Sequence, residues 1–411
     1  MEIVDAIKTI LEYGDTCNHC LGRFFGKRSF GLTNEERGRA LRITHEIVIN
    51  EPHQEPDPKS CWICGGETSR ADVWAAKVAE ATLGIGFDTF LIGTRVPPLM
   101  AESEEMVWSD LSLGDPEPLK AEMNREVGKI VSELTGKAVD FTRPDVVAIL
   151  DLSDGTVEVQ INPVFFSGRY MKYERGIPQT RWDCRACRGA GCERCDFTGK
   201  QYADSVEELI GRTVIEAFDA DGATLHGAGR EDIDARMLGS GRPFIMEVEV
   251  PQRRAVDLVA LEEEINQKAE GRVAVHLTGW ADRKMVQTLK SDKAHKKYRI
   301  LVETGSPVAP GAFKAALDQL KGVTIQQRTP MRVSHRRADR VRERQVIDIQ
   351  CTGRVDDRYW VEVVGEAGLY IKELVSGDGG RTRPSLAQIL GRTASVVSLD
   401  VVQVRTTNEE W

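Results

Sequence analysis

The stretch His226–Phe244 reads HGAGREDIDARMLGSGRPF, a composition that a packed helix or strand rarely has. Its nineteen residues include four glycines, three acidic residues and three arginines. Glycine is common where the backbone turns sharply or comes close to a partner. The side chains of Glu231, Asp232 and Asp234 are candidate nucleophiles or bases, and the arginines could keep a carboxylate ionised or bind phosphate. An exposed, salt-bridged surface loop would have the same composition. The rest of the chain is therefore needed to decide whether this stretch is a functional loop.

The size and composition of the chain are those of a soluble globular protein. It has 411 residues, of which 41% are hydrophobic and 29% are charged. At this length we expect two to four domains. No run of about 18 apolar residues is present that could span a membrane. The N-terminal residues MEIVDAIKTILEYGD lack the basic and then apolar profile of a signal peptide, so we expect a cytoplasmic protein.

Eight of the nine cysteines form four CxxC pairs. In a cytoplasmic protein such pairs indicate zinc more often than disulfides, because two thiolates on a tight turn already match half of a tetrahedral site. Redox chemistry is the minor alternative for the compact second group. We expect two structural sites with four thiolates each, formed by Cys17, Cys20, Cys61 and Cys64, and by Cys184, Cys187, Cys192 and Cys195.

Two segments have the composition of an RNA-binding surface, although the net charge is -9. FFSGRYMKYERGIPQTRW, residues 165–182, interleaves aromatic and basic side chains, which suits stacking on unpaired bases and contact with phosphates. A hairpin with its aromatics in the core and its cations in solvent fits equally well. The second segment, residues 328–344, contains seven arginines, and its alternative is a solvated charged loop.

Hydrophobic periodicity predicts an α+β protein. In the N-terminal part it indicates helices over residues 2–12, 33–47, 71–83 and 120–135, the second opened by a capping box at TNEE. A strand is expected within 86–98, and a hairpin around the pair Asp154–Gly155. From residue 205 onward we expect a larger domain with a mixed, mainly antiparallel sheet. Its predicted helices are 205–218, 260–271 and 313–320, and its predicted strands are 244–251, 274–280, 298–304, 344–353, 359–365 and 368–374.

Several familiar catalytic motifs are missing from the sequence. It contains no GxxxxGK[ST] phosphate loop, HExxH zinc-protease helix, GxSxG elbow or GxGxxG dinucleotide turn. What remains is the acidic Gly-rich loop, the segment KKYRILV around Tyr298, and the segment GLYIKEL around Tyr370 and Lys372. Each tyrosine alone is more often a half-buried strand residue than a catalyst.

Together these three segments resemble the pseudouridine synthases. In that superfamily the catalytic loop often contains GR-x-D, matched here by residues 229–232; a strand carries a tyrosine, matched by Tyr298; and a late segment reads YI and then a basic residue, matched by residues 370–372. With the cysteine pairs and the segments FFSGRYMKYERGIPQT and RTPMRVSHRRADRVR, the chain is similar over essentially its full length to the "Pus ten" family of archaeal tRNA pseudouridine synthases.

This resemblance implies a THUMP-containing accessory region and a pseudouridine synthase domain that acts on uridines 54 and 55 of the tRNA T-arm without an organic cofactor. The implied partner is tRNA, and we expect a monomer with structural zinc and no nucleotide cofactor. The expected domains are an N-terminal helical zinc region at 1–65, a THUMP-containing RNA-binding domain at 66–182, a second zinc knuckle and linker at 183–200, and the catalytic domain at 201–411.

The resemblance also assigns roles to single residues. Alignment on GR-x-D selects Asp232 as the catalytic carboxylate, with Asp234 in reserve, and leaves open whether it attacks the ribose or removes a ribose proton. Lys372 would keep it ionised, Tyr298 would stack on the target base and assist proton transfer at C5, and Tyr370 would shape the pocket. The expected RNA contacts are Arg230, Arg236, Arg169, Lys172, Tyr173, Arg332, Arg336 and Arg337.

Two other functions compete with this prediction. One is a zinc-knuckle RNA-binding protein without catalysis, in which the Gly-rich loop only contacts phosphates. The other is a THUMP-type RNA methyltransferase, against which the lack of a Gly-rich S-adenosylmethionine turn counts. The sequence leaves open whether one or both T-arm uridines are modified and whether both zinc sites are filled.

Overall fold

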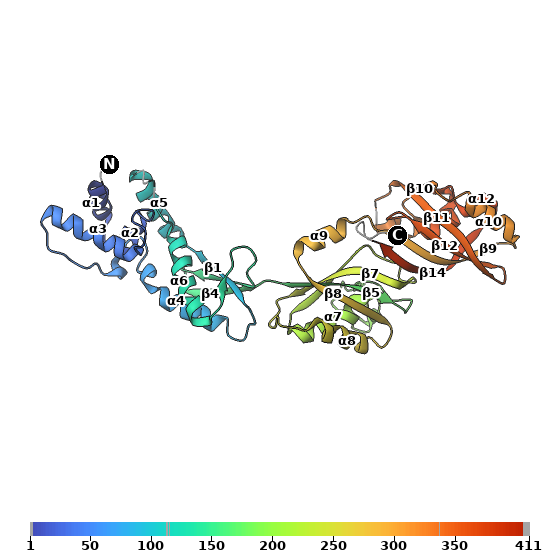
Figure 1. Cartoon of the computed structure of the whole chain (residues 1–411), viewed down its shortest axis with the longest axis horizontal. Coiled ribbons are helices and arrows are strands. Elements are labelled where there is room, and N and C mark those ends of the chain that lie inside the picture. The colour runs from blue at the N-terminus through green and yellow to red at the C-terminus, as the bar shows by residue number, and fades with distance from the viewer. Residues whose placement is uncertain (1–2, 112–113, 115, 337, 406–411) are drawn as a thin grey trace. The chain divides into compact units, whose positions relative to one another are not determined.

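The computed structural model describes residues 3–111, 114, 116–336 and 338–405. The chain divides into two compact units, drawn in Figure 1: Met1–Pro163 with Val250–Arg254, and Val164–Glu249 with Ala255–Trp411. Each unit has its own hydrophobic core. The division falls at residue 163 rather than at the expected 182, because the strand β5 (Val164–Lys172) pairs with strands of the second unit.

The first unit begins with helices around the first cysteine group. The predicted capping box is confirmed, since the Thr33 hydroxyl accepts a hydrogen bond from the Glu36 backbone while the Glu36 carboxylate accepts one from the Thr33 backbone. The helical elements of this unit are α1 (Ile3–Tyr13), α2 (Asn18–Arg23), α3 (Asn34–Ile49), η1 (Pro58–Ser60), η2 (Glu67–Arg70), α4 (Ala71–Ala81), α5 (Pro98–Leu111) and α6 (Leu119–Thr135).

A four-stranded sheet with the order β2-β1-β3-β4 completes the described part of this unit. Its strands are β1 (Thr89–Arg95), β2 (Ala138–Val139), β3 (Val146–Asp151) and β4 (Thr156–Ile161). β1 runs parallel to β2 and β3, whereas β3 and β4 form the predicted antiparallel hairpin. Helix α6 packs on β1 and α4 on β4, as Figure 1 shows, so the strands bury one face under the helices.

The second unit is built on a ten-stranded, mainly antiparallel sheet, which confirms the predicted fold class. The strand order is β13-β10-β11-β12-β9-β14-β7-β5-β8, with β6 paired to β7. One pair, β14 with β7, is parallel. The bounds are β6 (Gly222–Gly227), β7 (Arg236–Glu249), β8 (Val273–Ala281), β9 (His295–Thr304), β10 (Thr324–Arg328), β11 (Val341–Val355), β12 (Arg358–Gly365), β13 (Thr382–Arg383) and β14 (Ala394–Arg405).

Helices cover the sheet at both of its ends. α7 (Val206–Phe218) and α8 (Leu258–Lys268) pack near β6 and β8, and α10 (Pro310–Asp318) packs on β11 (Figure 1). α11 (Ile371–Ser376) contacts β14, close to the parallel strand pair. The remaining elements are η3 (Glu193–Cys195), α9 (Arg283–Ser291), η4 (Met331–Arg336), η5 (Asp378–Gly380) and α12 (Leu386–Leu390).

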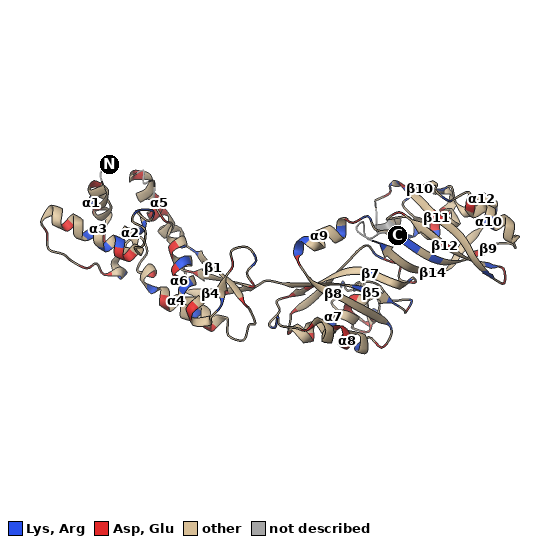
Figure 2. Ribbon diagram, in the orientation of Figure 1, with Lys and Arg blue, Asp and Glu red and all other residues tan. Residues whose placement is uncertain are grey.

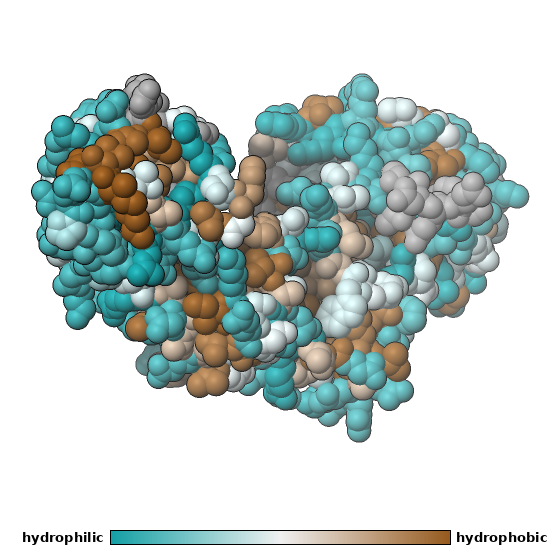
Figure 3. Space-filling view, turned by 60° about the vertical axis from the view of Figure 1, so that its left-hand side comes forward, coloured by the Kyte–Doolittle hydropathy of each residue, from teal (hydrophilic) through white to brown (hydrophobic). Residues whose placement is uncertain are grey.

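The surfaces of the two units are mixed in charge and carry some exposed hydrophobic residues. Figure 2 shows lysine and arginine together with aspartate and glutamate on both units. Hydrophobic residues also reach the surface of the first unit in Figure 3, and the last turn of α3 exposes Ile47, Val48 and Ile49. None of the described helices combines the length and hydrophobicity needed to cross a membrane.

Candidate active site

The three segments that resemble pseudouridine synthase motifs meet at one cavity of about 600 Å³ in the second unit. Residues 229–234 of the Gly-rich loop line one wall. Tyr298 of β9 and the segment from Gly368 to Lys372 line the others. Candidate residues more than a hundred positions apart in the sequence are therefore brought to one place by the pairing of β9, β14 and β7.

Asp232 lies in this cavity between two cations. One of its carboxylate oxygens accepts a hydrogen bond from Arg332 Nη1 at 2.9 Å, and the other lies 3.5 Å from Lys372 Nζ. Arg332 also donates to Glu373 at 2.7 Å, which fixes the guanidinium from the opposite side. These two cations hold the carboxylate of Asp232 in place at the cavity.

Asp234 is the closer partner of Lys372. Both of its oxygens accept hydrogen bonds from Lys372 Nζ, at 2.9 and 2.7 Å. Burial alone would raise the pKa of Asp234, but the hydrogen bond and charge of Lys372 outweigh it and hold that pKa below its usual value. The Asp234 side chain is 67% exposed against 31% for Asp232, so Asp232 lies deeper in the cavity.

Buried charged side chains hold the Gly-rich loop in place. Glu231 accepts hydrogen bonds from the Tyr170 hydroxyl at 2.8 Å and from Arg242 Nε at 2.9 Å. Lys172, on β5, is fully buried, and its Nζ donates to the carbonyls of Ile177 and Ile233 and, at 3.4 Å, to that of Asp232. The hydrogen bonds of Lys172 to the carbonyls of Asp232 and Ile233 fix the backbone that carries Asp232.

Two tyrosines complete the cavity. Tyr298 is 8% exposed, and burial is the main cause that raises its pKa to about 12, so its hydroxyl is protonated at neutral pH. Tyr370 is the N-cap residue of α11, where its backbone exchanges two hydrogen bonds with the side chain of Gln327. The prediction of a strand over 368–374 was therefore wrong: the chain turns at Tyr370 and enters a helix, which directs Lys372 toward the loop.

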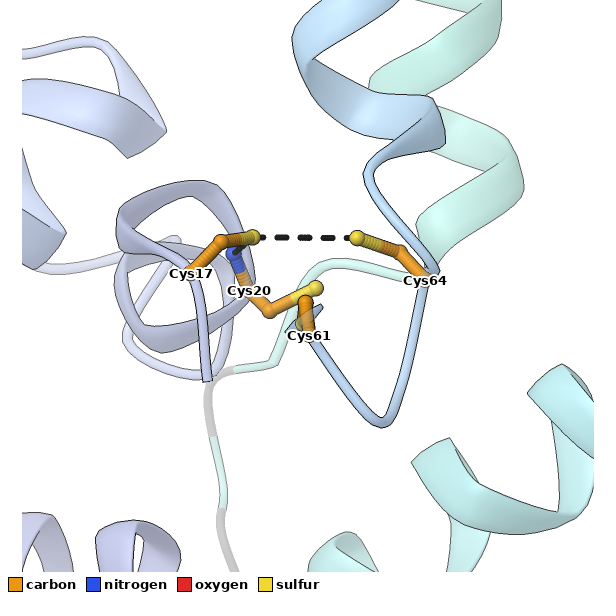
Figure 4. A group of neighbouring side chains, drawn as sticks. All are labelled: Cys17, Cys20, Cys61 and Cys64. Carbon is orange, nitrogen blue, oxygen red and sulfur yellow. Dashed lines mark hydrogen bonds between the residues drawn. The ribbon is translucent and has the colours of Figure 1, made fainter. Parts of the chain in front are cut away.

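The eight paired cysteines form two clusters suited to zinc. In each cluster the four sulfur atoms all lie within 4.8 Å of one another. Tetrahedral zinc with bonds of about 2.3 Å would place its sulfurs about 3.8 Å apart. The distances between Sγ atoms fit this: 3.7 Å for Cys17–Cys64 (Figure 4) and 3.8 Å for Cys187–Cys195. Four thiolates leave no open position, so both sites fit structural zinc rather than catalysis.

Comparison with known proteins places this site in a family. The family model described as "Pus10, C-terminal" matches residues 165–405, and the one described as "Pus10 THUMP domain, archaeal" matches residues 74–151. The chain belongs to the Pus10 family of tRNA pseudouridine synthases. The resemblance inferred from the sequence is thereby confirmed, and the THUMP match falls inside the region expected to contain it.

Relatives in this family match the chain along nearly its whole length. "tRNA pseudouridine synthase Pus10" of Methanothrix thermoacetophila is 43% identical, over 98% of this chain and 94% of the relative. That of Halorubrum lacusprofundi is 45% identical, over 100% of this chain and 98% of the relative. A solved Cbf5-Nop10-Gar1 complex is 17% identical over 48% of this chain and 45% of that chain, with a TM-score of 0.32, which is too low to support an argument.

The residues of this chain that were expected to contact RNA do not all lie at an open surface. The guanidinium of Arg230 lies 5.0 Å from the ring centre of Trp182 at the cavity wall. Arg236 instead pairs with the buried carboxylate of Asp400, at 2.9 and 2.8 Å. Arg169 donates to backbone carbonyls of Ser240 and Val404. These two arginines hold strands together in the structure, which was not foreseen.

Among the other residues expected to contact RNA, one is buried and two are accessible. The burial of Lys172 disagrees with a contact to RNA, because its amino group is enclosed and bonded to carbonyls. Tyr173 is 44% exposed and Arg332 reaches into the cavity. The side chain of Arg336 is not among those described, and Arg337 lies outside the described residues.

Sequence reasoning missed several cavity residues, Lys296 among them, and the buried charged residues beneath the loop. Lys296 lines the cavity two residues before Tyr298, so the alternation of a strand puts both on the same face. That spacing was available in the sequence, in KKYRILV. The pairing of Glu231 with Arg242 had no such signal, because it depends on how β7 returns past the loop.

Proposed function

We propose that this chain isomerises uridine to pseudouridine at positions 54 and 55 of the tRNA T-arm, with Asp232 as the catalytic carboxylate. The observation that carries the proposal is the position of Asp232, inside the cavity with Tyr298 and in contact with both Arg332 and Lys372. The reaction breaks one glycosidic bond, turns the base and joins its C5 to the ribose C1′. Atoms are conserved, and the hydrogen on C5 leaves as a proton while one is gained at nitrogen.

The geometry favours Asp232 over the reserve candidate Asp234. The carboxylate of Asp232 accepts a hydrogen bond from Arg332 and lies 3.5 Å from Lys372 Nζ, and its carbonyl accepts hydrogen bonds from Lys172 and from the amide of Ala235 at 3.0 Å. A group that acts on a reacting atom has to be held in place, and such fixed geometry contributes much of the rate. Asp234 is more exposed and is engaged by both of its oxygens with Lys372.

Tyr298 has the properties needed to handle the base. Its ring lines the cavity and its pKa of about 12 leaves the hydroxyl as a hydrogen-bond donor at neutral pH. The aromatic face offers stacking to a uracil, which has left its own stack in order to enter the cavity. We assign Tyr298 the stacking contact and the assistance of proton transfer at C5, and Tyr370 the shaping of the wall.

The first experiment is tritium release from tRNA that carries uridine labelled at C5. Formation of the new C–C bond expels that hydrogen, so release by the wild type without added cofactor establishes the reaction. We expect Asp232→Asn to lower the rate by at least about 10³-fold, in the range of losses after removal of a group acting in the transition state. Asp234→Asn is the matched control and should retain activity well above that of Asp232→Asn.

Binding of tRNA is measured in parallel for all three proteins. Loss of release only in Asp234→Asn would move the catalytic role by two residues. No release from the wild type on a tRNA that it binds would favour a non-catalytic RNA-binding protein. Release confined to one labelled position, with uridine 54 and uridine 55 labelled separately, would show that a single T-arm uridine is the substrate.

A further inference from the structure

Lys296 is a cavity residue to which the site described above gives no role. It lies on β9 (His295–Thr304) and points to the same side as Tyr298, two positions further along. Its amino group also borders the catalytic loop: a side chain added at Gly229 would start 3.7 Å from Lys296 Nζ. Lys296 therefore stands between the tyrosine and the loop that carries Asp232.

The charge of Lys296 has no acidic counterpart in the cavity. The acidic side chains of the lining each have a partner: Glu231 pairs with Arg242, Asp232 with Arg332, and Asp234 with Lys372. Among the described residues, no carboxylate lies within 4.0 Å of Lys296 Nζ, whose one hydrogen bond there goes to the carbonyl of Ala294 at 3.2 Å. An ammonium group has three donors, so two remain for a ligand.

The surroundings of this lysine favour an anionic ligand. The cavity lining holds five cationic and three acidic side chains before substrate enters. Burial, followed by the repulsion of Arg242, lowers the pKa of Lys296 to about 8, and the charge of Asp292 opposes this change only in part. Arg242 already pairs with Glu231, so Lys296 is the cation that an anionic ligand would compensate. In a nucleotide the anionic group is the phosphodiester, whereas the uracil oxygens are neutral.

We propose that Lys296 binds a phosphodiester adjacent to the target uridine and so seats the flipped nucleotide over Asp232. This inference rests on the proposed function, because it takes the target nucleotide as the ligand. The lysine supplies a charge-assisted hydrogen bond to a phosphate oxygen, and the ribose of the same nucleotide is held within reach of the carboxylate. Lys296 is a substrate-binding residue in this arrangement and takes no part in bond cleavage.

The test is a double-mutant cycle between protein and RNA. The tRNA is prepared with a single uncharged methylphosphonate linkage, either 5′ or 3′ of the target uridine. We expect Lys296→Met to weaken binding of unmodified tRNA about tenfold or more, as for loss of a hydrogen bond to a charged group. For one of the two linkages, the methylphosphonate should weaken binding to the wild type by a similar factor. The same methylphosphonate should not weaken binding to Lys296→Met any further, because the lysine that contacts this phosphate is already absent.

Lys297→Met is the matched control, since Lys297 lies on the opposite face of β9 and pairs with Glu362 at 2.8 Å. It should remain as sensitive to the methylphosphonate as the wild type. Independent, additive losses in Lys296→Met for both modified linkages would overturn the proposal and would leave uracil or an indirect structural effect as the explanation.

The pH dependence of binding gives a second readout. Lysine is charged below its pKa, so affinity of the free enzyme for the phosphate should fall as the pH rises through about 8. Lys296→Arg keeps its charge at high pH and should bind with little change between pH 7 and 9. A wild-type affinity that is flat over this range, or an equal fall in Lys296→Arg, would contradict the proposal.

These measurements separate the two proposals. Failure of tritium release by the wild type would reject the proposed function, whereas the binding cycle still reports whether Lys296 contacts a phosphate. Normal release together with an additive cycle would reject only the role of Lys296.

Discussion

Lys172 was expected at the RNA surface, and the structure uses it as an internal support. Its amino group donates to the carbonyls of Ile177 and Ile233 at 2.9 and 3.1 Å and lies 3.9 Å from Glu231. Burial lowers the pKa of Lys172, and the charge of Glu231 opposes that change. A residue type that is almost always exposed is thus buried here because the loop presents several acceptors to it.

Replacement of Lys172 by methionine should show this role. Methionine is an unbranched side chain only one atom shorter than lysine, but the carbonyls and Glu231 lose a buried partner, so we expect the free energy of unfolding to fall by about 3 kcal/mol. Turnover should fall more than tenfold with little change in tRNA affinity, because Asp232 is displaced while the exposed surface is kept. Urea unfolding and the separation of kcat from KM measure the two effects.

Lys284→Met, on the exposed face of α9, is the control for that change. A substitution there should alter the free energy of unfolding by less than about 0.5 kcal/mol. If Lys172→Met binds tRNA more weakly while its stability and kcat are unchanged, Lys172 contacts RNA and does not act as an internal support.

At the scale of elements, local patterns predicted most helices and strands correctly. The capping box of α3 and the hairpin of β3 and β4 depend on neighbouring residues, so the sequence contains their whole signal. β7 begins at Arg236, inside the Gly-rich stretch. The glycines and charged residues of this stretch do not have the alternating pattern of a strand, so this start was not predicted. The strand pairs with β14 through residues 164 positions away, and such a partner has no local signature.

In the candidate site, too, residues with a local sequence signal could be predicted and residues brought together by long-range pairing could not. The motifs around Asp232, Tyr298 and Lys372 could be found, since their residue types and order are written in the sequence. Their supports could not, because Glu231, Arg242 and Lys172 meet only through the pairing of β5 with β7. For Arg236, the parallel register with Asp400 decides that the guanidinium faces a buried carboxylate instead of solvent.

The junction of β7 and β14 provides a test at this scale. Gly239 has a φ of 59°, and a Cβ at this position would lie 2.0 Å from the carbonyl oxygen of Val402. Gly239→Ala should therefore force the two strands apart and lower the free energy of unfolding by about 3 kcal/mol or more. Activity should fall as well, because Arg236 and the Gly-rich loop that carries Asp232 lead directly into this junction.

Gly271→Ala is a matched control for the cost of placing alanine in a left-handed backbone conformation. Gly271 has a φ of 73° but no atom within 4 Å of an added Cβ among the described residues. The left-handed backbone alone should cost about 1 kcal/mol. Equal losses for the two variants, measured by urea unfolding, would mean that contact with β14 adds nothing at Gly239.

At the scale of the whole molecule, each compact unit combines a hydrophobic core with a cluster of four cysteines. The first cysteine cluster is part of the core of the first unit, where all four residues are buried together with Phe24. The second cluster lies at Asp183–Lys200 in the other unit, beside the wall formed by Trp182. Each unit thus has one four-thiolate site of its own, and unfolding should occur in two transitions rather than one.

Metal analysis of the purified chain should find two zinc ions, one for each cluster. Cys61→Ser should lower this number to one and weaken the transition of the first unit, because three thiolates hold zinc less tightly and folding of such a site is coupled to metal binding. The transition of the second unit should keep its midpoint. Cys351→Ser is the control: Cys351 belongs to neither cluster, so the variant should retain both metals and both transitions. A wild-type chain with one zinc, unchanged in Cys61→Ser, would show that the buried first cluster folds without metal.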